Sequence, residues 1–190
     1  GVLGEQEDRE GQGEAREVDP GRPGGLADDR DDPHADPVGD RHDTVGAVAC
    51  DAAGGVAVAV STGGIWLKMP GRVGDSPLPG SGFWAVDGEG AAVATGTGEC
   101  LMKILISAEV TGGIRCHGDA MRACADAVAL LTAQFGTDIG GVIAVGPAGQ
   151  VGFALNTHGM GRGVWQAGME RPGVAVDPDE PWDVPLPPGD

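Results

Sequence analysis

The sequence predicts an α+β fold in which an antiparallel sheet carries helices on one face. Three observations indicate it: pairs of short β-rich runs open the apolar part of the chain, two helical patterns follow, and another pair of β-rich runs comes after them. Strand pairs joined by short turns favour antiparallel pairing. Helices grouped in one part of the sequence favour a single helical layer against the sheet.

Each element has its own signal. The β-rich runs form three pairs, each around a turn rich in Gly, Asp or Pro: residues 44–50 with 55–61, 83–86 with 91–95, and 142–145 with 151–155. Residues 99–111 have apolar side chains at helical spacing, and a second helical pattern covers 119–135 with Gly136 as the expected C-cap. Residues 62–82 form a long loop, and loops of that length are usually functional.

The first 43 residues differ from the rest of the chain. They are rich in Gly, Asp, Glu, Arg and Pro and have almost no apolar periodicity. Such a segment buries too little apolar surface to offset the entropy of ordering it. We therefore expect residues 1–43 to be a disordered linker or the remnant of a truncated subunit, and residues 44–190 to form the folded domain.

Composition excludes several classes of partner. The net charge is −17, with 12 Lys and Arg against 29 Asp and Glu, which argues against binding of nucleic acid through its phosphates. No apolar run approaches the roughly 18 residues of a membrane span, and no signal peptide is evident, so a cytoplasmic protein is expected. The four cysteines lack CxxC spacing, which favours packed thiols over a metal site.

Thr44 is the first candidate for chemistry because it opens a buried-strand pattern directly after the polar segment. If the chain were cut before Thr44, its free α-amino group, with a reference pKa of about 7.7–8.0, could accept the proton of its own hydroxyl. One residue would then be both nucleophile and base. A threonine at the start of a strand is usually only a strand residue, so the hypothesis depends on the motifs that accompany it.

Three further motifs follow before residue 100: STGG at 61–64, GRVGDSP at 71–77 and TGTGE at 95–99. Arg72 offers a planar fork of donors that matches a carboxylate, and Asp75 offers acceptors that suit an ammonium group. Taken alone, Arg72 and Asp75 could be an ordinary loop ion pair. The TGTG run could equally be a tight turn or an anion site before a helix.

In this order and spacing, the four motifs resemble the β subunit of the plant-type asparaginases and isoaspartyl aminopeptidases. These are N-terminal-nucleophile (Ntn) hydrolases, a group that also includes glycosylasparaginase. The likeness covers Asp43 to about Glu180. It implies the β-subunit half of an αββα sandwich with the α-subunit half largely missing. It also implies an αβ heterodimer that pairs into (αβ)2 and needs no metal or organic cofactor.

The resemblance further implies catalytic roles. Thr44 would be the nucleophile, released by autocleavage of the Asp43–Thr44 bond. Thr62 would be the second threonine, whose hydroxyl bonds to the nucleophile and tunes it. Thr95 and Gly96 would form the oxyanion hole.

Substrate-binding roles follow in the same way. Arg72 and Asp75 match the pair that holds the α-carboxylate and the α-amino group of the substrate, and Gly98 lets the chain approach closely. The implied reaction is hydrolysis of L-asparagine or of β-aspartyl dipeptides, with release of aspartate. One alternative is a glycosylasparaginase-type amidase, in which Asp is typical at the position of Asp43. The other is an inactive truncated fragment that needs an α subunit.

Overall fold

The computed structural model describes residues 42–184. The elements are, in chain order, β1 (His42–Cys50), β2 (Val56–Ile65), β3 (Phe83–Val86), β4 (Gly90–Gly96), α1 (Gly98–Ile104), α2 (Ile106–His117), α3 (Ala120–Phe135), β5 (Gly140–Val145), β6 (Val151–Leu155), β7 (Arg162–Val164) and β8 (Gly173–Ala175). This order confirms the α+β prediction. The segment predicted to be disordered, residues 1–43, lies outside the described residues except at its last two positions, which belong to β1.

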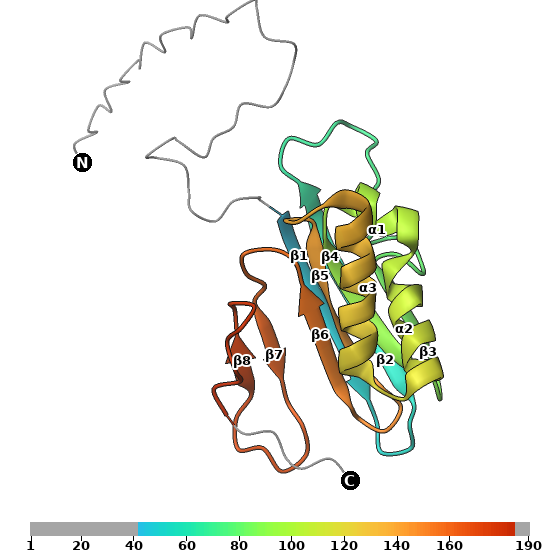
Figure 1. The fold of residues 1–190 in the computed structure, drawn as a ribbon, viewed down its shortest axis with the longest axis vertical. Coiled ribbons are helices and arrows are strands. Elements are labelled where there is room, and N and C mark those ends of the chain that lie inside the picture. Colours follow the sequence, from blue (N-terminus) through green and yellow to red (C-terminus); the bar gives the residue numbers. More distant parts are fainter. Residues whose placement is uncertain (1–41, 185–190) are drawn as a thin grey trace, which may run out of the picture. The chain divides into compact units, whose positions relative to one another are not determined.

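The main sheet has the strand order β3-β4-β5-β6 and is antiparallel throughout. Helices α2 and α3 pack along this sheet (Figure 1). The buried core between them combines large side chains from the helices with alanine and valine from the strands: Ile106, Val110, Ile114, Cys124, Val128 and Leu131 with Ala92, Ala94, Val142 and Ala144. The small strand residues let the helices approach closely, as expected for a chain so rich in glycine and alanine.

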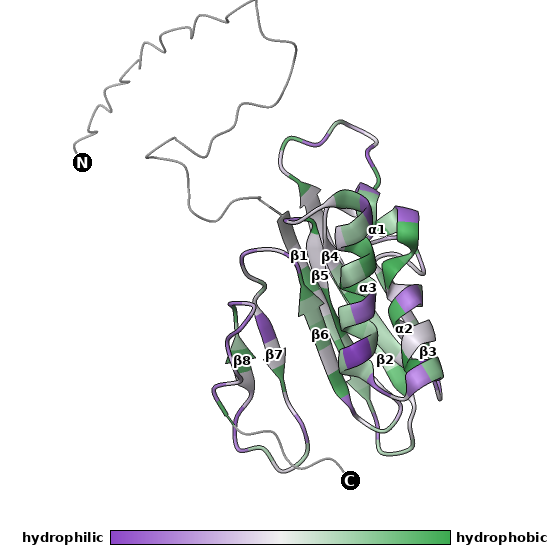
Figure 2. Ribbon diagram, in the orientation of Figure 1, coloured by the Kyte–Doolittle hydropathy of each residue, from purple (hydrophilic) through white to green (hydrophobic). Residues whose placement is uncertain are grey.

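Strands β1 and β2 form a separate antiparallel hairpin that packs on the other face of the main sheet. A side chain at Gly46 would meet Val93 of β4 at 2.7 Å, so the two backbones lie close together. Burial alternates along both strands: Val48 and Val58 are half-buried, and their neighbours are exposed. In Figure 2 the strand β2 is coloured mainly as apolar or neutral, while purple stretches lie on helices, on loops and on β7.

The helical region differs from the prediction at one point. The pattern at 99–111 predicts one helix, whereas the chain forms α1 and α2 with a break at Leu105, whose φ is 50°. Leu105 ends α1 in the left-handed conformation, and its amide donates to the carbonyls of Leu101 and Met102. Apolar spacing continues through the break, so periodicity alone could not detect it.

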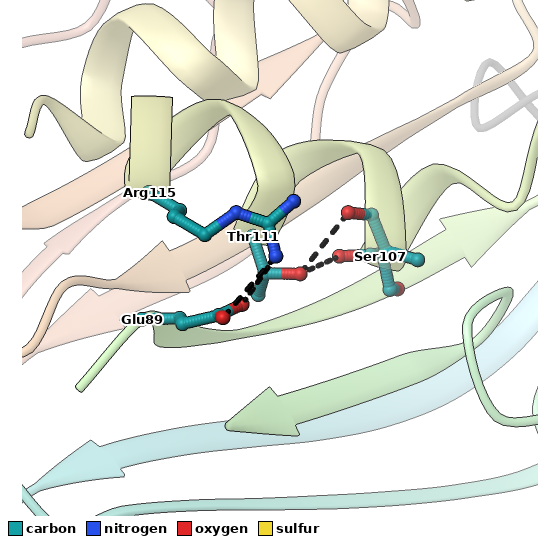
Figure 3. Close-up of polar contacts among 5 residues, drawn as sticks. Glu89, Ser107, Thr111 and Arg115 are labelled. Carbon is teal, nitrogen blue, oxygen red and sulfur yellow. Dashed lines mark hydrogen bonds and ion pairs between the residues drawn. The ribbon is translucent and has the colours of Figure 1, made fainter. Parts of the chain in front are cut away.

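Helix α2 is held to the rest of the domain by polar contacts at both ends, and Figure 3 shows the one between Arg115 and Glu89. The Ser107 hydroxyl donates to the buried carbonyl of Ser81 at 2.6 Å, and Arg115 donates to the Glu89 carboxylate in the turn before β4. Helix α3 begins as predicted, with the Asp119 carboxylate accepting from the amide of Arg122 at 3.0 Å. Such a cap satisfies one of the unpaired amides of the first helical turn.

The β7–β8 hairpin was not predicted from sequence. It is organised by Arg162, whose guanidinium is buried and lies 4.3 Å from the ring centroid of Phe153. The same guanidinium donates to four carbonyl oxygens, those of Met160, Val176, Asp177 and Glu180. Three of these partners, Val176, Asp177 and Glu180, lie 14 to 18 residues away in sequence, and nothing local to Arg162 indicates them.

Candidate active site

Thr44 and Thr62 lie opposite each other on β1 and β2. The Thr44 hydroxyl donates to Thr62 Oγ1 at 3.1 Å. The amide of Gly64 donates to the same oxygen at 2.9 Å, which anchors the Thr62 side chain on the backbone of its own strand. The two hydroxyls that the resemblance pairs are therefore in contact.

The β1–β2 ladder is irregular beside the Asp43–Thr44 bond. Asp43 pairs with Gly64 and Thr44 pairs with Thr62, so Gly63 is left as an extra residue on β2. A bulge of this kind interrupts the ladder and increases the local twist. The peptide bond predicted to be cleaved thus lies at a point where regular pairing is broken.

Arg72 is bound by Glu99, a partner that the sequence analysis missed. Its Nε donates to Glu99 Oε1 and its Nη2 to Oε2, both at 2.9 Å, in a two-bond ion pair. These bonds raise the pKa of the Arg72 guanidinium, although its burial opposes the shift. Glu99 is 27 residues away in sequence. Its place at the end of the TGTGE motif is the one signal that could have indicated it.

Asp75 is buried, with 6% of its surface exposed. Among the residues that the structure describes, no hydrogen-bond donor reaches its Oδ2. Burial raises the pKa of this carboxyl, and backbone hydrogen bonds and the charge of Arg72 only partly oppose the shift. A side chain at Gly98 would lie 2.8 Å from Asp75 Oδ1 and 3.1 Å from Arg72 Nη2, so glycine permits a close approach there.

Thr95 and Gly96 end β4. Gly96 has a φ of 141°, and a side chain there would meet the carbonyl oxygen of Ile139 at 2.2 Å. The glycine is thus needed for the close approach of β4 and β5. The Thr97 amide donates to the same carbonyl at 2.8 Å.

The strand directions bring the end of β4 to the same side as Thr44. Gly46 lies against Val93 in the facing sheet. At the far end of β1, the thiol of Cys50 donates to the carbonyl of Pro147. Pro147 follows the end of β5, where Val145 pairs with Ala91 near the start of β4. Strands β1 and β4 therefore run in opposite directions across the two layers. Thr95 thus lies toward the end where β1 begins, and the long loop and α1 are at this end in Figure 1.

A pocket of about 410 Å³ lies next to Thr62, whereas Thr44, Thr95 and Gly96 are not among the residues that line it. Its lining includes Thr62, Lys68, Arg72, Gly74 and Asp75. Lys68 was not singled out from sequence; its ammonium group donates to the carbonyl of Gly63, beside Thr62. The pocket therefore combines a hydroxyl with two cationic groups and one buried carboxylate. Within residues 42–184, no cluster of three His, Cys, Asp or Glu side chains could hold a metal ion, and no helix is long and apolar enough to cross a membrane.

A hydroxyl pair next to a pocket with a fixed arginine and a buried carboxylate is an arrangement suited to a hydrolase. Comparison with known proteins makes the assignment specific. The family model described as "Asparaginase" matches residues 6–172, a range that includes most of the segment before Thr44. The chain belongs to this asparaginase family, as its motifs predicted.

Three relatives show the breadth of the similarity. The chain is 48% identical over 138 residues to the plant-type L-asparaginase of Pyrobaculum calidifontis, covering 73% of this chain and 46% of the relative. It is 40% identical over 144 residues to a probable isoaspartyl peptidase/L-asparaginase of Drosophila melanogaster, covering 75% and 42%. It is 40% identical over 115 residues to the N(4)-(beta-N-acetylglucosaminyl)-L-asparaginase of Rattus norvegicus, covering 60% and 33%. The chain thus spans less than half the length of these relatives.

Proposed function

We propose that this chain supplies the β-subunit part of an N-terminal-threonine amidohydrolase that releases aspartate from L-asparagine or β-aspartyl dipeptides. The observation that carries the proposal is the contact between the Thr44 and Thr62 hydroxyls next to a pocket that contains Arg72 and Asp75. A nucleophile, a group that orients it and two opposite charges for the substrate are thereby close together. The family relatives named L-asparaginase and isoaspartyl peptidase support the same reaction.

The charges of the pocket fit a substrate with a free amino acid end. Arg72 can bind the α-carboxylate through the N–H groups that Glu99 does not occupy. Asp75 Oδ2, buried without a donor in the described part of the chain, can accept from the α-ammonium group. An ammonium ion beside Asp75 would stabilise the ionised form of a carboxylate whose pKa burial has raised. The side-chain amide would then be presented to Thr44.

Activation would begin within β1. The Thr44 hydroxyl attacks the carbonyl carbon of Asp43, the acyl group moves from nitrogen to oxygen, and water hydrolyses the resulting ester. The products are a new carboxyl group on Asp43 and a free α-amino group on Thr44. The bulge beside this bond supports the assignment, because the register of the ladder shifts between Asp43 and Thr44.

Turnover would use the amino group that cleavage releases. It accepts the Thr44 hydroxyl proton while the oxygen attacks the substrate amide, and it returns the proton to the leaving ammonia or amine. Thr95 and Gly96 are proposed to stabilise the oxyanion. Water then hydrolyses the aspartyl ester on Thr44. This sequence of steps uses no metal or organic cofactor.

We propose that the α-subunit part of the family fold is a binding partner of this chain. The outward face of the β1–β2 hairpin is exposed and consists of small apolar side chains: Val45, Ala47, Ala49, Ala57 and Ala59. An exposed apolar sheet face with open edges favours association. We propose that an α subunit covers it, forming an αβ heterodimer that pairs into (αβ)2, and that the chain is inactive without this subunit.

A second candidate is cleavage of the bond between a sugar and an asparagine side chain. Its support is the 40% identity to the rat enzyme named for that substrate. Both reactions require the same free amino acid end, so Arg72 and Asp75 do not separate them. A comparison of the turnover of glycosylated asparagine with that of L-asparagine separates the two reactions.

Intact mass spectrometry tests the proposal. The chain is incubated at neutral pH, alone and with the α subunit of a relative, beside a Thr44→Ala control. In the incubation with the α subunit we expect a fragment that begins at Thr44, absent from the control, together with release of aspartate from asparagine, whereas the chain alone should release no aspartate. A chain that stays uncleaved under both conditions would contradict the proposed nucleophile.

A further inference from the structure

Arg72 and Asp75 carry opposite charges, lie three positions apart in one loop and flank the same point. A side chain at Gly98 would contact atoms of both residues, Asp75 Oδ1 at 2.8 Å and Arg72 Nη2 at 3.1 Å. Two such groups would be expected to pair with each other. Instead, Arg72 bonds to Glu99.

We propose that Glu99 is a positioning residue that holds the Arg72 guanidinium away from Asp75, so that the arginine and the aspartate stay available to the two ends of a zwitterionic substrate. The inference rests on the proposed function, because it concerns the same pocket. It assigns a role to a residue outside the catalytic pair and outside the two groups that would touch substrate.

The geometry of the Arg72–Glu99 pair supports this role. The guanidinium is a planar fork with five N–H donors, and Glu99 occupies the edge formed by Nε and Nη2. The other terminal nitrogen, Nη1, lies beside Gly74, where a side chain would come within 2.6 Å of it. Gly74 lines the pocket. One edge of Arg72 is therefore held by Glu99, and the opposite edge lies at the pocket wall, where a carboxylate can reach it.

The burial of the two carboxylates shows why a competing partner is needed. The Glu99 side chain is 49% exposed, whereas Asp75 is 6% exposed. A charge pair in a less polar setting attracts more strongly, so Asp75 would be the stronger electrostatic partner if the geometry were equal. The two-bond contact with Glu99 offsets that advantage. The result is a buried carboxylate whose Oδ2 has no donor within residues 42–184.

Three full-length proteins test the inference: the unmodified chain, Glu99→Gln and the matched control Glu89→Gln. Gln keeps the size of Glu but removes the charge that holds the arginine. Glu89→Gln removes the corresponding charge from the Arg115–Glu89 pair, which does not line the pocket. Binding of L-aspartate is measured by calorimetry, and KM and kcat for L-asparagine are measured on the cleaved enzyme with its α subunit.

We expect Glu99→Gln to weaken aspartate binding and to raise KM by about tenfold, with kcat changed by less than about threefold. Glu89→Gln should match the unmodified chain in aspartate affinity, in KM and in kcat. A merely structural role of Glu99 predicts equal, small losses of thermal stability in both variants and no selective rise in KM. Unchanged aspartate affinity in Glu99→Gln would overturn the inference.

A crystal structure of Glu99→Gln provides a readout independent of activity. We expect the Arg72 guanidinium to bond to Asp75 in this variant, and an arginine that keeps its position would overturn the inference. The two proposals can fail separately. If the unmodified chain binds no aspartate and cleaves no asparagine, the proposed function fails, while the position of Arg72 in Glu99→Gln still decides the role of Glu99.

Discussion

Asp75 shows how a residue proposed to bind substrate can oppose stability. Its carboxyl is buried, its Oδ2 has no donor among the described residues, and its pKa is raised by desolvation. In the unfolded chain the same carboxyl ionises at its ordinary pKa of about 3.9. Folding therefore works against ionisation of Asp75 at neutral pH.

We expect Asp75→Asn to stabilise the protein at neutral pH and to weaken substrate binding. The pKa of the Asp75 carboxyl is higher in the folded protein than in the unfolded chain. The ionised carboxylate therefore lowers the free energy of unfolding most at pH values above the folded pKa, and this effect disappears below the unfolded pKa. Thermal unfolding from pH 7 down to pH 4 should show a gain of a few degrees, on the order expected for about 1 kcal/mol, that shrinks with acidity. A gain that grows as pH falls would contradict the assignment, and aspartate binding should be lost at every pH.

Several site residues could be proposed one by one because their evidence is local. Thr44, Thr62 and Gly98 belong to short motifs that resemble those of the asparaginase family, and their roles stay predictions. Glu99 and Lys68 could not be predicted, because their relevance comes from what they bond. Glu99 reaches an arginine 27 residues away, and Lys68 folds back onto the carbonyl beside Thr62.

At the scale of elements, the close approach of β4 and β5 depends on glycine. Gly96 faces the Ile139 carbonyl at a distance that no side chain could tolerate, and its φ of 141° is unfavourable for other residues. We expect Gly96→Ala to destabilise the fold by more than about 3 kcal/mol, the range of severe backbone or packing defects. Chemical denaturation measures the loss.

Gly112→Ala is the matched control for this substitution. Gly112 lies within α2, and nothing approaches the position that its side chain would occupy. Alanine should stabilise the helix there by about 0.5–1 kcal/mol. Similar losses in both variants would show that alanine at either glycine disturbs the fold in a general way, and would contradict the role of Gly96.

The three predicted strand pairs are present because each depends on neighbouring residues and a short turn. The break at Leu105 and the β7–β8 hairpin were missed for the opposite reason. The left-handed backbone at Leu105 lies between two helices whose apolar spacing is continuous. The hairpin depends on Arg162 bonding to carbonyls as far as 18 residues away.

At the scale of the whole molecule, the exposed hairpin face determines how the chain should behave in solution. Ala47 and Ala59 pair across β1 and β2 and are exposed. We expect Ala47→Lys to reduce self-association of the isolated chain, because a charge on an open apolar sheet opposes stacking. The same change should prevent assembly with the α subunit and restoration of activity.

Size-exclusion chromatography with light scattering measures self-association and assembly with the α subunit, and Ala133→Lys is the control. Ala133 is exposed on α3, so a lysine there adds the same charge to a surface that the proposal leaves free. If Ala47→Lys still assembled and gained activity as the control does, the hairpin face would not be the subunit interface.

The sequence alone determined the α+β class, the strand pairs, the family and most of the residues proposed to act in the site. These features depend on local patterns and on short motifs whose spacing is preserved along the chain. The tertiary structure decided what bonds to Arg72, that Asp75 is buried with no donor to its Oδ2 among residues 42–184, and which face of the β1–β2 hairpin is exposed. Burial and long-range pairing arise only when distant segments pack together, so no local pattern contains them.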